Sequence, residues 1–161
     1  MKFEIVDPNA RATKLVDVID LCVAQRVAGL NPGRTDHGTL WLGLSIVVDE
    51  DSLFAPADTL GYFALNFRLY AGPAVLHSHD ETGKTCDLPS EVSPIWIKDA
   101  AEAESLIQAG LLERPQLAID GEVFWQWPQP KPDLTEWVNR VTQASRQRPI
   151  VIDRDTIIRK V

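Results

Sequence analysis

Two histidines separated by one residue, His77 and His79, are the side chains best suited to metal chemistry. Alternate residues of a strand share a side, so both imidazoles would point the same way and could hold a divalent metal. A catalytic zinc needs a third protein ligand and an open position. The chain offers four candidates for the third ligand: Asp80, Glu81, Cys86 and His37. The pattern leaves two alternatives: a metal-assisted hydrolase that uses His77 and His79, or a pair of exposed histidines where a strand enters a polar loop.

A second group of side chains could bind a small acidic molecule or a protein partner. It lies on the less apolar side of two segments with period-two alternation, 40–48 and 62–70. If these segments pair, aromatic rings, an amide and a guanidinium come together, which suits an acidic ligand. We expect this surface to contain Trp41, Ser45, Tyr62, Asn66, Arg68 and Tyr70. The alternative is an ordinary solvated or helix-covered sheet face.

Two tryptophans, Trp125 and Trp127, precede a proline-rich stretch. Tryptophans in such a setting often anchor an interface with a partner or with a second copy of the chain. Large aromatic side chains also fill hydrophobic cores. The sequence therefore leaves two alternatives for this pair, an interface and the core.

Several sequence motifs that would indicate catalysis are missing. Gly83-Lys84-Thr85 lacks the upstream glycine and the strand-to-helix setting of a phosphate loop. The chain has no Gly-x-Ser-x-Gly nucleophile motif and no Cys-x-x-Cys pair. We therefore favour a small soluble binding protein that is non-catalytic and forms a homo-oligomer.

The first half of the chain must position the histidines and the candidate ligand surface. Lys2–Val6 is typical of a strand, and apolar residues at three- and four-residue steps predict a helix from about residue 9 to Ala28. Strands are expected over 40–48, over 62–70 and over Ala74–His79. We expect residues 80–94, which show no periodicity, to form a loop.

The second half holds the clearest capping and turn signals. Asp99 and Glu102 form a capping box for a helix that ends at Gly110. Asp120-Gly121 predicts a hairpin over 117–125 whose two faces are both apolar. A further helix should begin at Asp133, and two short strands should close the chain over 149–153 and 156–161.

The order of elements from Ile95 to Ala144 resembles the second half of a thioredoxin-like fold, in which a proline precedes a hairpin. That resemblance implies a cis bond before Pro115 and a redox-inert domain. It covers about a third of the chain, and the first half departs from the pattern. We therefore assign no family.

Length and composition predict one α+β domain over residues 1–161, with a mostly antiparallel (mixed) sheet packed by about three helices. The chain has 161 residues and a net charge of −7. Residues 140–161 carry +4 and the rest of the chain −11. An acidic body disfavours general nucleic-acid binding, and the basic end should pair with acidic groups of its own chain or of a second copy. No membrane-spanning run or signal sequence is visible, and two distant cysteines indicate reduced thiols, so we expect a cytoplasmic protein.

Overall fold

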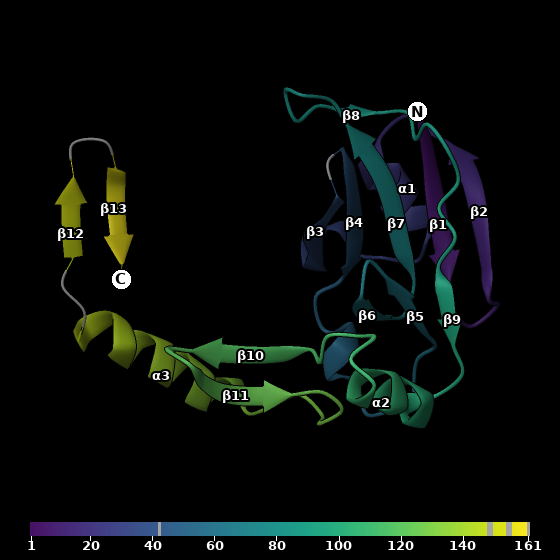
Figure 1. Ribbon diagram of the computed structural model, residues 1–161. Coiled ribbons are helices and arrows are strands. Elements are labelled where there is room, and N and C mark those ends of the chain that lie inside the picture. Colours follow the sequence, from purple (N-terminus) through teal and green to yellow (C-terminus); the bar gives the residue numbers. More distant parts are fainter. Residues whose placement is uncertain (42, 148–149, 154–155, 161) are drawn as a thin grey trace.

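A computed structural model describes residues 1–41, 43–147, 150–153 and 156–160, with the backbone alone at 134, 137, 144–147 and the two closing segments. It shows an α+β protein with antiparallel sheets and, among these residues, three α-helices (Figure 1). The sequence predicts one sheet packed by about three helices. In the described residues the three helices do not all pack on one sheet. The strands instead form four separate sheets.

The main sheet has six strands in the order β2-β1-β7-β4-β3, and β8 pairs with the end of β7. Every pair is antiparallel. The strands are β1 (Lys2–Asp7), β2 (Ala12–Asp17), β3 (Thr35–Trp41), β4 (Leu44–Asp49), β7 (Ala74–His79) and β8 (Thr85–Cys86). The predictions of strands at Lys2–Val6 and at Ala74–His79 are confirmed.

A second sheet has three strands in the order β6-β5-β9. It consists of β5 (Tyr62–Leu65), β6 (Arg68–Ala71) and β9 (Ile95–Ile97). Beyond it lie α2 (Ala100–Gln108) and the hairpin of β10 (Gln116–Ile119) and β11 (Glu122–Gln126). The last elements are α3 (Leu134–Gln147), β12 (Ile150–Asp153) and β13 (Thr156–Lys160), which lie to one side of the sheets in Figure 1.

Three hydrophobic clusters hold these layers together. The cluster around Phe3, Val47 and Val75 lies between one face of the main sheet and α1 (Leu21–Val27). A second cluster, around Ile46, Leu76 and Phe63, joins the other face to the three-stranded sheet. A third, which includes Ile97 and Ala103, packs that sheet against α2 and the β10–β11 hairpin. The core therefore lies between four layers in the order α1, main sheet, three-stranded sheet, and α2 with the β10–β11 hairpin.

The predicted helix from residue 9 to Ala28 is wrong in its first half. Ala12–Asp17 pairs with β1 along its whole length, from Lys2 opposite Asp17 to Asp7 opposite Ala12. The helix begins only after Asp20, whose carboxylate accepts a hydrogen bond from the amide of Val23 at 2.9 Å. Pairing with a neighbouring strand has outweighed a helical spacing of apolar residues.

Each of the two long predicted strands is a hairpin. The segment 40–48 spans the end of β3, a turn at Gly43 and most of β4, and Leu42 lies outside the described residues. The segment 62–70 turns at Asn66 and Phe67, whose φ angles of 50° and 63° are those of a left-handed turn. Phe67 is consequently exposed at the tip of this turn.

The capping and turn predictions of the second half are confirmed. Asp99 accepts the amide of Glu102 at 2.9 Å, although Glu102 reaches back to the amide of Lys98 rather than of Asp99. Gly110 ends α2 with φ of 76°. The cis bond that a thioredoxin-like half implies is not at the expected place: among the described residues the cis peptide bond lies at Trp127–Pro128 rather than before Pro115.

Candidate functional site

The expected ligand surface is divided because each hairpin reverses the chain. In the β5–β6 pair, Phe63 lies opposite Tyr70 and Leu65 opposite Arg68, so these four side chains share the face toward the main sheet. Tyr62 lies on the other face, where it is buried and its hydroxyl accepts the amide of Asp58 at 2.9 Å. Tyr62 is therefore a core residue, separated from Arg68 and Tyr70.

Trp41 and Asn66 lie together on a surface apart from Tyr70, although Asn66 also lines a second hollow with Arg68. Together with Leu65 and Ile95 they line a shallow hollow beside the loop that precedes β9. The amide of Asn66 is already engaged, because it donates to the backbone carbonyl of Leu40. Of the predicted set, Arg68 and Tyr70 share the pocket described next, and the amide of Asn66 is not available there.

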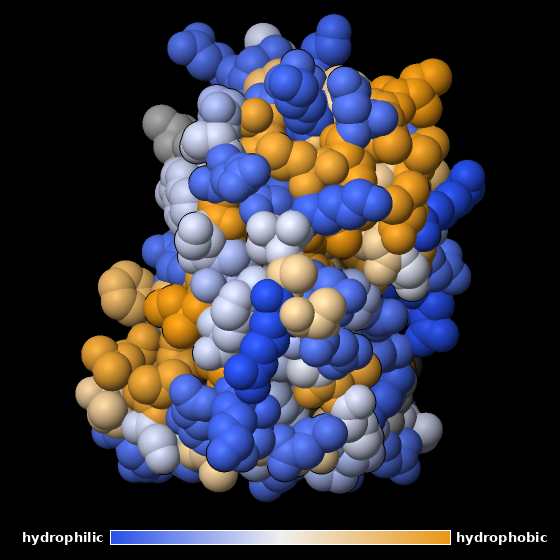
Figure 2. Space-filling model, turned by 90° about the vertical axis from the view of Figure 1, so that its right-hand side faces the viewer, coloured by the Kyte–Doolittle hydropathy of each residue, from blue (hydrophilic) through white to orange (hydrophobic). Residues whose placement is uncertain are grey.

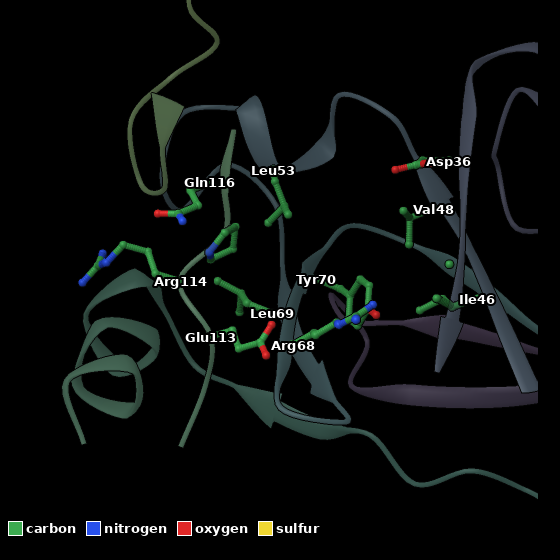
Figure 3. Close-up of a pocket in the computed structure, with 12 residues that line it drawn as sticks. Asp36, Ile46, Val48, Leu53, Arg68, Leu69, Tyr70, Glu113, Arg114 and Gln116 are labelled. Atoms are coloured by element: carbon green, nitrogen blue, oxygen red, sulfur yellow. The ribbon is translucent and has the colours of Figure 1, made fainter. Parts of the chain in front are cut away.

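Arg68 and Tyr70 line a pocket of about 640 Å³ between the main sheet and the three-stranded sheet (Figure 3). A volume of this size suits a small organic molecule. One wall comes from β3 and β4 and the other from β6 and residues 113–116. The apolar part of the lining is Ile46, Val48, Leu53, Leu69 and Pro115. Gly38 also lies in the β3 wall, and its lack of a side chain leaves that part of the pocket open.

Two polar side chains of the pocket, Tyr70 and Glu113, lie beside Arg68. Its side chain lies alongside Tyr70 in Figure 3, and Glu113 lies next to it, since the backbones of Arg68 and Glu113 form an isolated bridge. Within the described part of the chain, Arg68 forms no ion pair. Arg68 is exposed to solvent and lines the pocket without a carboxylate partner, so its guanidinium can bind an anion there.

Tyr70 remains a neutral phenol at physiological pH. Its burial raises its pKa above the usual value, and the negative charge of Glu113 acts in the same direction, whereas Arg68 lowers it. The hydroxyl can therefore donate a hydrogen bond to an anion held by Arg68. Arg68 and Tyr70, which the sequence had placed on one surface, form the end of the pocket that can bind an anion; we call it the recognition end.

Arg114 lines the same pocket but is occupied elsewhere. Its guanidinium donates to both carboxylate oxygens of Glu104 and, at 3.0 Å, to the carbonyl of Trp127. In Figure 3 it points away from the other lining side chains. Its charge is thus neutralised by Glu104, and Arg68 is the cation available to a ligand.

The three histidines of the chain lie on the opposite face of the main sheet. His77 pairs with Ser45, and His79 lies within 3.2 Å of the Ser45 hydroxyl through Nδ1. The ring centroids of His77 and His79 are 6.4 Å apart. The strand order also brings His37 to this face, since it lies opposite Val47 on β4.

In the described part of the chain, none of the candidate third ligands completes a metal site with His77 and His79. Cys86 pairs with Ser78 and therefore lies on the other face from His77. Asp80 accepts hydrogen bonds from Thr82 and Lys84 within its own turn. In the part of the chain that the structure describes, no three His, Cys, Asp or Glu side chains are close enough to hold a metal ion.

Both tryptophans of the hairpin lie in the core. Trp125 is 3% exposed and Trp127 1% exposed, and they pack in the cluster that also contains Tyr62 and Ala103. Leu117 lies opposite Trp125, next to a bulge between Leu117 and Ala118, so these two side chains share the hairpin face that packs in the core. The opposite face is not covered, since Val123 is exposed.

Exposed apolar side chains occur elsewhere on the surface. Figure 2 shows hydrophobic groups in an upper and a lower area of the side on which β2 and β9 lie. Leu15 of β2 and Ile95 of β9 are exposed, as is Ile19 after β2. These side chains are available to a protein partner, but nothing in the molecule identifies one.

Comparison with known proteins assigns no relative: no family model matches the chain, and neither a curated protein nor a solved structure matches it. Each helix in the described part of the chain is too short or too polar to cross a membrane. The pocket at Arg68 is therefore the feature from which a function can be argued.

Sequence reasoning missed three lining residues, Gly38, Asp36 and Glu113. The strand at Thr35–Trp41 was not expected, because its central residues are polar and its alternation is weak. Glu113 lies between α2 and the hairpin, in a segment without periodicity. The turn at Gly43 was the one available signal, since a glycine there favours a hairpin over a single long strand.

Proposed function

We propose that this protein binds a small organic acid in the pocket between its two central sheets. Arg68 would hold the acid group through paired hydrogen bonds, and the Tyr70 hydroxyl would donate a third. The apolar walls would take the carbon skeleton of the ligand. The observation that carries this proposal is the guanidinium of Arg68, without a carboxylate partner, at the recognition end of an apolar-walled pocket.

Binding is favoured over catalysis by the chemistry of the lining. The described residues around the pocket supply carboxylates, guanidiniums, a phenol and an amide, and none is Ser, Thr, Cys, Lys or His. A covalent mechanism that uses one of those five nucleophiles therefore has no candidate within the lining. The proposal agrees with the non-catalytic binding protein that the sequence favours.

The test is titration with 4-methylpentanoate, a small acid with a branched apolar chain, followed by calorimetry and thermal shift. Wild type should bind at millimolar concentration and gain thermal stability. Arg68→Ala should weaken binding by about 10- to 100-fold, since it removes charge-assisted hydrogen bonds. Gly38→Leu should also reduce binding, because the new side chain would occupy the pocket.

Arg26→Ala is the matched control. It removes the same charge from an exposed position on α1, on the far side of the main sheet. This variant should bind like wild type. No binding by wild type, or equal binding by wild type and Arg68→Ala, would refute the proposal.

A further inference from the structure

The charged side chains that line the pocket do not suit a ligand that carries only a negative charge. Arg68 brings one available positive charge, since Arg114 is paired with Glu104. Glu113 and Asp36 bring two negative charges, and neither forms an ion pair within the described residues. A monoanion at Arg68 would therefore be bound against a net negative surrounding.

The two carboxylates occupy different ends of the pocket. Glu113 is next to Arg68 through the backbone bridge, and its charge is felt by Tyr70. Asp36 lies across the pocket on β3, near Val48, and points into the open space in Figure 3. In Figure 3 the Arg68 guanidinium extends toward Tyr70 and the Glu113 carboxylate lies near the base of the Arg68 side chain, so each can meet a different charged group of one ligand at this end of the pocket.

An α-amino acid carries its two charges on neighbouring atoms. With its carboxylate at Arg68 and Tyr70, its ammonium would lie next to Glu113, and its side chain would extend between Ile46, Val48 and Leu53. We infer that the ligand is a free α-amino acid with an apolar side chain. This inference rests on the proposed function of the pocket and adds the role of Glu113 to it.

Three probes with one carbon skeleton test the inference. L-leucine carries both charged groups, 4-methylpentanoate lacks the ammonium, and 3-methylbutan-1-amine lacks the carboxylate. Wild type should bind L-leucine at least about tenfold more tightly than either of the others, because each charged group contributes its own hydrogen bonds. Calorimetry on each pair of protein and probe gives the three dissociation constants.

Glu113→Gln and Asp36→Asn form the matched pair of variants. Glu113→Gln should weaken L-leucine by about tenfold and leave 4-methylpentanoate as tight as before or tighter. Asp36→Asn should keep the preference for L-leucine, since Asp36 lies away from Arg68. The amide in each variant preserves size, so unchanged thermal unfolding of the free protein checks that both remain folded.

The outcomes separate this inference from the proposed function. If 4-methylpentanoate binds wild type as tightly as L-leucine and Arg68→Ala abolishes both, the pocket binds acids but the inference about the ammonium is wrong. The inference is also wrong if Glu113→Gln keeps the full preference for L-leucine. If none of the three probes binds wild type, the proposed function and the inference both fail.

Discussion

Glu4 is fully buried in the main sheet, and one of its oxygens accepts the amide of Val92 at 2.8 Å. This hydrogen bond fastens the segment before β9 to β1. We expect Glu4→Leu to lower the free energy of unfolding by about 1–3 kcal/mol relative to Glu4→Gln, since Leu leaves the Val92 amide without an acceptor. Urea denaturation of the two variants measures the difference.

Gln is the suitable reference because its carbonyl can still accept that amide. Hydrogen exchange at Val92 provides an independent readout. It should be faster in Glu4→Leu than in Glu4→Gln. Equal stability and equal exchange in the two variants would show that the buried carboxyl does not hold this segment.

His77 should make stability depend on pH. Burial lowers the pKa of His77 below its usual value, and the charges of His37 and His79 act in the same direction. The unfolded chain therefore takes up a proton near pH 6.5 while the folded protein resists it. Stability contributed by the neutral imidazole is full above about pH 6.5 and falls as the pH decreases further.

Urea denaturation at neutral and mildly acidic pH checks this prediction. His77→Phe should lose less stability than wild type between the two conditions, because it has no imidazole at this position. His37→Gln alters an exposed histidine on the same sheet face and should retain most of the wild-type decrease. The same decrease in His77→Phe as in wild type would contradict the assignment to His77.

At the scale of elements, one ion pair connects α2 to the hairpin. Arg114 and its hydrogen bonds lower the pKa of Glu104 to about 2. The ionised form of Glu104 therefore stabilises the fold above pH about 4.5, and this contribution disappears as the pH falls toward about 2. We expect Glu104→Gln to be less stable than wild type at neutral pH, with the difference shrinking through that acidic range.

Thermal unfolding followed by circular dichroism from neutral pH to about pH 2 measures this convergence. Glu122→Gln is a useful comparison, since Glu122 pairs with Arg140 on the exposed side of the hairpin. A constant difference between Glu104→Gln and wild type at all pH values would show that the ion pair is not responsible.

The elements show which parts of the fold the sequence could predict. Local signals were sufficient where one residue determines the backbone, as at the Asp99 cap, Gly110 and the Asp120-Gly121 turn. The period-two pattern placed Leu40, Leu44, Ile46 and Phe63 correctly in one core. It could not show the turn at Asn66 and Phe67, and that turn moves Tyr62 away from Arg68 and Tyr70.

At the scale of the whole molecule, the C-terminal segment stands apart from the sheets. The β12–β13 hairpin lies away from them in Figure 1, and a two-stranded hairpin alone is marginally stable in water. Residues 140–161 carry +4 against −11 for the rest of the chain. We therefore expect homodimers in which this segment contacts the acidic body of a second copy.

Light scattering at micromolar concentration tests the prediction in low and high salt. The dimer mass should dominate in low salt and decline in high salt, since the attraction between exposed charges is screened. A chain ending at Asp133 should be monomeric in both conditions. A monomer mass for the full chain in low salt would exclude the dimer.

The candidate site could be predicted only in part because it forms between sheets. Arg68 and Tyr70 follow from alternation within one strand. Asp36 and Gly38 come from β3 and Glu113 from the segment between α2 and β10, and only the packing of the sheets brings them together. Strand order depends on contacts between distant segments, which the local pattern of residues does not contain.

The two walls of the pocket belong to sheets whose described strands share no ladder pairing. The distance between these walls is therefore set by side-chain packing and by the hydrogen bond from the Asn66 amide to the Leu40 carbonyl, and not by a backbone ladder. A molecule held against both walls would add a further connection between two layers that are joined by apolar contacts, connecting loops and the hydrogen bond from Asn66 to Leu40. Binding of a ligand in the pocket would therefore make the packing of the two sheets, and with it the protein as a whole, more rigid.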